Sequence, residues 1–174
     1  MKKAKIFSNG IRKIPHLAGF LPEYSLSTHK SAIDCVLGWG LRPSTRKARA
    51  YAHTHQLPFI ALEDGFLRSL GLGVQGYPPF AMVVDDMGIY YDTSRPSRLE
   101  HLILHTPHLS TTETQYAQQL IQQIVDFHLS KYNHSPDYVP SETKQDKEIV
   151  LVIDQTFGDM AIHYGGADET TFQH

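Results

Sequence analysis

Hydrophobic residues between positions 32 and 62 group into a strand, a helix and a second strand. Residues 32–37 form a short apolar run closed by a glycine-bounded turn, which predicts a buried strand. A proline and a serine then open residues 43–57, where apolar residues recur at three- and four-residue spacing until Pro58 ends the predicted helix. Residues 59–62 resume as a strand. This order is typical of a parallel βαβ unit and favours an α/β fold with a Rossmann-like parallel sheet and flanking helices.

Further along the chain, the pattern predicts a hairpin and two capped helices. Residues 81–84 form a third strand, and residues 89–91 follow a glycine turn as its hairpin partner. Capping boxes at Ser97 and Ser110 begin helices that reach about residues 105 and 130. The second of these helices has one apolar face, formed by Tyr116, Leu120, Ile124 and Phe127.

A polar, proline-containing segment over residues 131–147 separates two parts of the chain. Residues 149–153 then form the clearest pattern of a buried strand. A helix that begins at Asp168 has no room to finish. We therefore predict an N-terminal Rossmann-like lobe over residues 1–147 and the truncated start of a continuing module over residues 148–174.

Composition narrows the class of protein. Hydrophobic residues make up 41% of the chain and aromatic residues 10%, as in ordinary globular proteins. Because 16 basic residues face 18 acidic ones, no long-range field is expected to recruit nucleic acid. The single cysteine, Cys35, lies in an apolar run and is expected to be a buried, inert thiol. Neither a signal peptide nor the ~20 apolar residues of a membrane span is present, so a cytoplasmic protein is expected.

The glycine-rich segment 71–76 matches the three-glycine pattern of dinucleotide sites, but such sites need a helix that opens within the pattern. Tyr77 and two prolines follow, so no helix is expected and a nucleotide-dependent reductase is disfavoured. The segment is expected to be a loop that touches ligand through its backbone. The 11 histidines show no supported zinc-ligand spacing, and no metal or cofactor is predicted.

Carboxylates that follow predicted strands are the main candidates for catalytic groups. Glu63–Asp64, Asp85–Asp86 and Asp154 each come just after a strand, so parallel topology is expected to bring at least two of these groups to one edge of the sheet. Glycosyl transfer uses such groups, because the anomeric carbon gains positive character. Arg68 is suited to bind a phosphate or a sugar carboxylate. The alternative is that these carboxylates cap helices and turns and that Arg68 forms a surface ion pair.

Five ordered segments resemble capsule proteins of the KpsC type, and they extend over nearly the whole chain. The segments are IFSNGIRKIPHL (residues 6–17), GWGLRPS (38–44), LEDGFLRSLGLG (62–73), DDMGIYYD (85–92) and DQTFGD (154–159). The resemblance implies a retaining β-Kdo glycosyltransferase. Such an enzyme uses CMP-Kdo to build a short Kdo linker on a phosphatidylglycerol-type lipid acceptor, as a peripheral protein at the cytoplasmic face of the inner membrane.

The resemblance also implies a GT-B-like architecture with the active site between two Rossmann-like lobes. The chain would supply the N-terminal, acceptor-side lobe, and a missing C-terminal lobe would hold most of the CMP-Kdo donor. Full family members are much longer. A non-catalytic binding or assembly protein, derived from the N-terminal lobe, is the alternative from a different class.

The resemblance assigns roles to individual residues. Asp154 becomes the candidate nucleophile of a double displacement, and Glu63 the candidate general acid or base, with Asp64 as the competing choice. Arg68 would bind a substrate anion, and the glycine loop would shape the cleft. The substrate-binding candidates are Arg68, Gly71, Gly73, Asp85 and Asp86.

Overall fold

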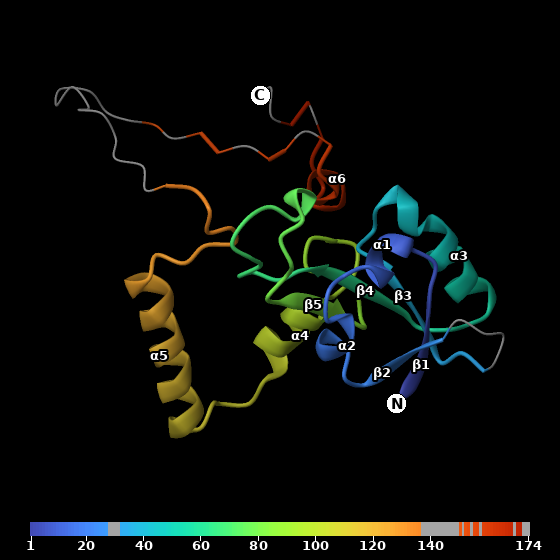
Figure 1. Ribbon diagram of the computed structural model, residues 1–174, viewed down its shortest axis with the longest axis horizontal. Coiled ribbons are helices and arrows are strands. Elements are labelled where there is room, and N and C mark those ends of the chain that lie inside the picture. The colour runs from blue at the N-terminus through green and yellow to red at the C-terminus, as the bar shows by residue number, and fades with distance from the viewer. Residues whose placement is uncertain are drawn as a thin grey trace.

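A five-stranded sheet forms the centre of the protein (Figure 1). The computed structural model describes residues 1–27, 32–136, 150, 152–153, 155–156, 158–168 and 170–171. The strand order is β2-β1-β3-β4-β5, and the first four strands are parallel. The strands are β1 (Lys2–Ile6), β2 (Tyr24–Ser27), β3 (Cys35–Trp39), β4 (Phe59–Asp64) and β5 (Met82–Asp85). The predicted α/β fold with a mostly parallel, Rossmann-like sheet is confirmed.

Helices connect and flank these strands (Figure 1). The α-helices are α1 (Asn9–Arg12), α2 (Leu17–Phe20), α3 (Arg46–Thr54), α4 (Arg98–His105), α5 (Thr111–Asp126) and α6 (Met160–Tyr164). Two 3-10 turns, Pro43–Thr45 and Gly73–Gln75, complete the described helical structure. The first turn leads directly into α3, so the predicted strand, helix and strand between residues 32 and 62 are confirmed with boundaries shifted by a few residues.

Both faces of the sheet are packed, because successive side chains of a strand point to opposite sides. Cys35 and Leu37 of β3 join a buried cluster with residues of α1 and α2. Val36 points the other way and packs with Ala48 and Ala52 of α3. Cys35 is 2% exposed, which confirms the expected buried thiol.

The β1 strand is absent from the sequence-based prediction because three lysines interrupt its apolar residues. Ala4 and Ile6 are nevertheless buried, and β1 lies between β2 and β3 in the middle of the parallel part. Parallel strands buried on both faces usually read as continuous apolar runs, and β1 does not. Its side chains alternate between the core and solvent.

The last strand, β5, runs antiparallel to β4, with Asp64 opposite Met82 and Ala61 opposite Asp85. The carboxyl end of β5 therefore lies at the other edge of the sheet from the carboxyl end of β4. Of the three carboxylate groups that follow predicted strands, Glu63–Asp64 and Asp85–Asp86 therefore do not share an edge, and Asp154 lies outside the described residues. The predicted hairpin partner at residues 89–91 is also wrong: these residues form a turn, in which Ile89 is completely buried.

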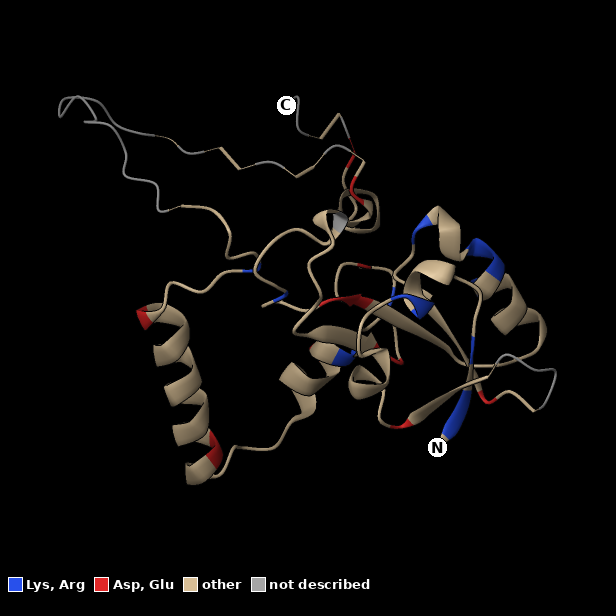
Figure 2. Ribbon diagram, in the orientation of Figure 1, with Lys and Arg blue, Asp and Glu red and all other residues tan. Residues whose placement is uncertain are grey.

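Two helices, α4 and α5, form an arm: α4 begins beside β5, and α5 stands apart from the sheet (Figure 1). Ser97 and Ser110 cap them as predicted, and Ser110 with Glu113 forms a full capping box. Neither helix contains a buried residue. The apolar face predicted for α5 is exposed, with Tyr116 at 63% and Phe127 at 70%. In Figure 2 the acidic residues of α5 lie near its two ends, which leaves its middle uncharged.

The predicted strand at 149–153 is not observed among its described residues. Val150, Val152 and Ile153 have no regular secondary structure and are each more than three-quarters exposed. The five strands of the sheet include none of these three residues. The other residues of the segment, Asp154 and the predicted boundary at residues 147–148 lie outside the described residues.

Within the described part of the chain, no helix is long and apolar enough to cross a membrane.

Candidate active site

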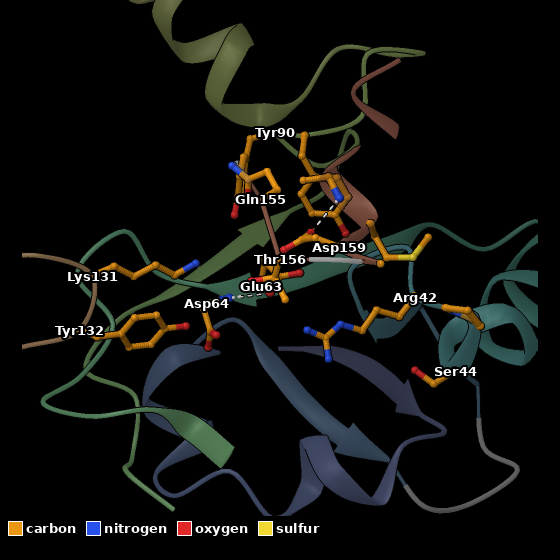
Figure 3. A pocket seen from close by; sticks show the side chains of 15 residues that line it. Arg42, Ser44, Glu63, Asp64, Tyr90, Lys131, Tyr132, Gln155, Thr156 and Asp159 are labelled. Carbon is orange, nitrogen blue, oxygen red and sulfur yellow. Dashed lines mark hydrogen bonds between the residues drawn. The ribbon is translucent and has the colours of Figure 1, made fainter. Parts of the chain in front are cut away.

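A cleft of about 720 Å³ opens at the carboxyl ends of β3 and β4, a size common for ligand sites. Its walls come from five stretches of chain: 42–44, 63–64, 90–91, 131–132 and the described residues between 155 and 161. Figure 3 shows side chains from these stretches directed toward one another across the cleft. Ligands of open parallel sheets gather at this edge, so the cleft lies where the topology favours a site.

Glu63 is the carboxylate at the centre of the cleft (Figure 3). It is half-buried at the end of β4, and its Oε1 accepts a hydrogen bond from the backbone N–H of Asp64 at 3.2 Å. Burial raises the pKa of the Glu63 carboxyl above its ordinary value of 4.5, while Arg42 and Lys131 oppose part of this shift. The raised pKa makes this carboxyl group a better proton acceptor than an ordinary glutamate, which suits it to a role in proton transfer.

Gly40 allows Glu63 and Tyr91 to come together. Its φ of +50° is in the left-handed region, and a Cβ there would clash with the Tyr91 hydroxyl and lie 2.8 Å from Glu63 Oε2. The Tyr91 hydroxyl in turn accepts a hydrogen bond from the Leu41 N–H at 2.9 Å. The loop after β3 is thus fixed to the wall of the cleft.

Asp64 and Arg68 form an ion pair beside the cleft. Arg68 Nε lies 2.7 Å from Asp64 Oδ1, and its Nη1 donates to Ser69 Oγ and to the Tyr77 carbonyl. Arg68 is 8% exposed and does not line the large cleft. Its guanidinium therefore holds the glycine loop in place, and the substrate-anion role proposed for it from sequence stays a prediction.

The glycine loop wraps around these groups. A Cβ at Gly73 would meet the Arg68 guanidinium, and one at Gly71 would meet the Tyr77 ring. Both glycines thus permit close packing of side chains. The loop contains a short 3-10 turn and no α-helix, so the structure lacks the helix that a dinucleotide site needs.

Asp85 and Asp86 lie away from the cleft and hold α4. Asp85 is 1% exposed and accepts hydrogen bonds from the backbone N–H groups of Met87, Gly88 and Arg98. Asp86 pairs with the Arg98 side chain at 2.7 Å and 2.8 Å, and the hydrogen bond from Arg98 lowers the pKa of the Asp86 carboxyl. Both carboxylates are engaged in the capping and ion-pair roles that were the alternative to substrate binding.

Asp154, the candidate nucleophile, lies outside the described residues, but its neighbours Gln155 and Thr156 line the cleft. Asp159 faces the cleft from the same segment and accepts a hydrogen bond from the Ala161 N–H at 2.9 Å as the cap of α6. The α6 helix is attached to the sheet lobe because Thr93 donates from its N–H and its hydroxyl to the Tyr164 carbonyl, each at 3.0 Å.

Four further cleft residues were not predicted from sequence. Arg42 and Lys131 stand on opposite sides of Glu63, with their charged ends directed toward it (Figure 3). Tyr90 and Tyr91 form an aromatic wall, where burial raises the pKa of Tyr90 to about 12 and keeps its hydroxyl protonated. Arg42 lies in the GWGLRPS segment, and the resemblance of that segment to KpsC-type proteins could have identified it. Lys131 follows the α5 helix, and no local pattern connects it to Glu63.

Among the described residues, no group of three His, Cys, Asp or Glu side chains could hold a metal ion. The arrangement instead combines a carboxyl group of raised pKa, two cations and three phenol groups. Such a set can move a proton at a hydroxyl and bind an anionic substrate.

Proteins similar in sequence to this chain share descriptions that concern bacterial surface polysaccharides. A family model described as "Capsule polysaccharide biosynthesis protein" matches residues 34–142. The capsule polysaccharide modification protein LipA of Neisseria meningitidis serogroup B is 59% identical over 99% of this chain and 25% of its own length. The lipopolysaccharide-processing protein LpsZ of Rhizobium meliloti is 40% identical over 76% of this chain and 30% of its own length. The chain thus spans about a quarter of the length of these curated relatives.

Two solved structures are similar in fold. The Thermosulfurimonas dismutans KpsC β-Kdo 2,4 transferase superposes with a TM-score of 0.88 at 40% identity, covering 98% of this chain and 54% of that chain. The KpsC β-Kdo 2,7 transferase of the same organism gives 0.60 at 25% identity, covering 94% and 52%. The fold is therefore that of one part of a GT-B-like Kdo transferase, and the chain belongs to the capsule polysaccharide biosynthesis protein family.

Proposed function

We propose that this chain supplies the acceptor-side lobe of a β-Kdo transferase that uses CMP-Kdo as donor. The observation that carries the proposal is the position of Glu63, a carboxyl group of raised pKa at the centre of a cleft at the strand ends. The likeness to Kdo transferases in fold supports the same conclusion. A C-terminal lobe, which the longer relatives have room for, would hold most of the donor nucleotide.

In this proposal the reaction proceeds with retention in two displacements. The carboxylate of Asp154 attacks the anomeric carbon of Kdo and CMP leaves with the bonding electron pair, which gives a glycosyl-enzyme ester. A hydroxyl group of the lipid-linked Kdo acceptor then attacks the same carbon and releases Asp154. Glu63 accepts the proton of that hydroxyl group, a role that its raised pKa favours. The phosphatidylglycerol-type acceptor places the reaction at the cytoplasmic face of the inner membrane.

The test is mass-spectrometric detection of Kdo transfer from CMP-Kdo to a synthetic Kdo-terminated glycolipid. The chain is compared with a longer form that carries the segment present in the relatives. Activity is expected in the longer form, and Glu63→Gln should lower the rate by roughly 10²- to 10⁴-fold, as for loss of a general acid or base. Asp154→Ala should abolish transfer.

Glu100→Gln is the matched control, because Glu100 lies exposed on α4 outside the cleft and should leave the rate unchanged. Absence of transfer in both forms would overturn the proposal and favour a non-catalytic assembly protein. An unchanged rate in Glu63→Gln would remove the acid or base role from that residue.

A further inference from the structure

The last turn of α4 begins and ends with a histidine. His101 is half-buried and His105 is exposed. Side chains four residues apart on a helix share one face, with their Cβ atoms about 5–6 Å from each other. The two imidazole rings are stacked, with their centroids 4.5 Å apart and an angle of 21° between their planes. Two nitrogen ligands are therefore held side by side on one face of the helix.

A hydrogen bond to the backbone decides which nitrogen of His105 can bind a ligand. Its Nδ1 lies 3.1 Å from the carbonyl oxygen of His101. Because a carbonyl oxygen only accepts, this contact requires the proton on Nδ1, and in the neutral ring the lone pair is then on Nε2. Histidines that bind metal ions commonly have this arrangement, in which one ring nitrogen donates to a carbonyl group and the other coordinates the ion.

The two ends of α4 are held differently. At its start, the N–H of Arg98 donates to Asp85 Oδ2 at 2.9 Å, and the Arg98 side chain pairs with Asp86. In the last turn, Ile103 is 72% exposed and Leu104 is 67% exposed, so these apolar side chains add little packing. A helix of 8 residues is marginal in water without such packing. The last turn is thus the part of α4 that a cross-link between side chains would stabilise most.

We propose that His101 and His105 bind a divalent transition-metal ion, such as Zn²⁺ or Ni²⁺, which clamps the last turn of α4. Imidazole nitrogen suits these ions, whereas Mg²⁺ and Ca²⁺ prefer oxygen ligands. The described residues group no third His, Cys, Asp or Glu with the pair, so water fills the remaining coordination positions. No metal was expected from the sequence because no cysteine or carboxylate ligands accompany the histidines, and this site needs neither.

The clamp also acts on the connection between the two helices of the arm. Residues 106–110 lead from α4 to α5 without regular secondary structure (Figure 1). The N–H of Thr106 donates to the Leu102 carbonyl at 3.0 Å, so the connection starts from the same turn that the two histidines span. A bound ion that orders this turn therefore also orders the point at which the chain leaves α4.

Isothermal titration calorimetry of this chain with ZnCl₂, NiCl₂ and MgCl₂ tests the proposal. Zn²⁺ and Ni²⁺ should each show a tight binding component that Mg²⁺ lacks. His101→Ala and His105→Ala should each weaken this component by at least the roughly 10- to 100-fold that loss of a group supporting a metal ligand costs. His53→Ala is the matched control, because His53 is exposed on α3 and has no histidine four residues before or after it.

A double variant tests the spacing of the histidines and keeps their number. It combines His101→Ala with Ile103→His, so that α4 still carries two histidines, now two residues apart and facing different sides of the helix. Because Ile103 is 72% exposed, its replacement should not disturb packing. The affinity for Zn²⁺ should stay as low as in His101→Ala alone.

Amide hydrogen exchange measures the effect of the ion on α4. Zn²⁺ should slow exchange over residues 102–106 and leave β3 and β4 unchanged, because the ion stabilises only the turn that it bridges. Wild-type affinity for Zn²⁺ in His105→Ala or in the double variant would overturn the proposal and indicate adventitious binding by scattered histidines. Tight binding that leaves exchange in α4 unchanged would overturn the clamp.

Discussion

The sheet lobe and the α4–α5 arm are stabilised in different ways. Every buried hydrophobic residue among those described lies before residue 90, in or around the sheet. The two helices of the arm have well-formed N-caps but contain no buried residue, and apolar side chains of α5 are exposed. Local signals therefore suffice to start both helices, but only the sheet lobe combines its elements into a core. An isolated helix of this length is marginal in water, so contacts between elements decide stability.

The largest effect is expected inside the sheet lobe. Leu62 is completely buried in the core, and Leu62→Ala should lower the free energy of unfolding by about 2–5 kcal/mol. Urea denaturation followed by circular dichroism measures this change. A loss below about 1 kcal/mol would show that the core does not carry the stability of the chain.

A smaller effect, with a defined pH dependence, is expected at Glu63. Because the pKa of its carboxyl is raised in the folded protein, the folded chain retains a proton that the unfolded chain has already released above pH 4.5. Stability at Glu63 is therefore lost as the pH rises above 4.5, and Glu63→Gln avoids this loss. The melting temperature of the variant should rise relative to wild type from pH 4 to pH 7.

Glu113, in the arm, provides the opposite case. The hydrogen bond from the Ser110 side chain lowers the pKa of the Glu113 carboxyl, so its stabilising effect is present above pH 4.5 and is lost as the pH falls below that value. The melting temperature of Glu113→Gln should therefore not exceed that of the wild type at pH 7. If the melting temperatures of Glu63→Gln and Glu113→Gln changed with pH in the same way, the opposite pKa shifts of these two carboxyl groups would be contradicted.

The smallest effect is expected on the exposed face of α5. Ile121 is 61% exposed, so Ile121→Gln should change the free energy of unfolding by no more than about 0.5 kcal/mol. The same denaturation experiment measures it beside Leu62→Ala. A loss above about 1 kcal/mol would show that this face is covered in solution, and the contrast between the two regions would no longer hold.

Sequence patterns predicted elements whose signals are local. The capped starts of α4 and α5 and the βαβ unit around α3 follow from caps, spacing and apolar runs. The β1 strand was missed because alternating lysines conceal Ala4 and Ile6, and the direction of β5 could not be read because strand orientation depends on pairing. The apolar run at 149–153 has the composition of a buried strand. A strand also needs a partner to pair with, and composition does not show whether one is present.

The candidate site was predicted only in part for the same reason. Glu63 could be found because it follows an apolar strand, and it does lie at the centre of the cleft. Lys131 comes from a segment 68 residues further along the chain, which is held beside the glycine loop because its carbonyl accepts from the N–H groups of Arg68 and Ser69. Such long-range pairing leaves no mark on the residues around Lys131.

The position of Cys35 gives the protein a built-in reporter of core opening. It is the single cysteine of the chain, it packs with residues of α1 and α2 on one face of the sheet, and burial raises the pKa of its thiol. The thiolate that reacts with alkylating reagents is therefore available only when the packing around Cys35 opens. The rate of alkylation then measures how often this part of the core opens, in the unmodified protein and without an introduced label.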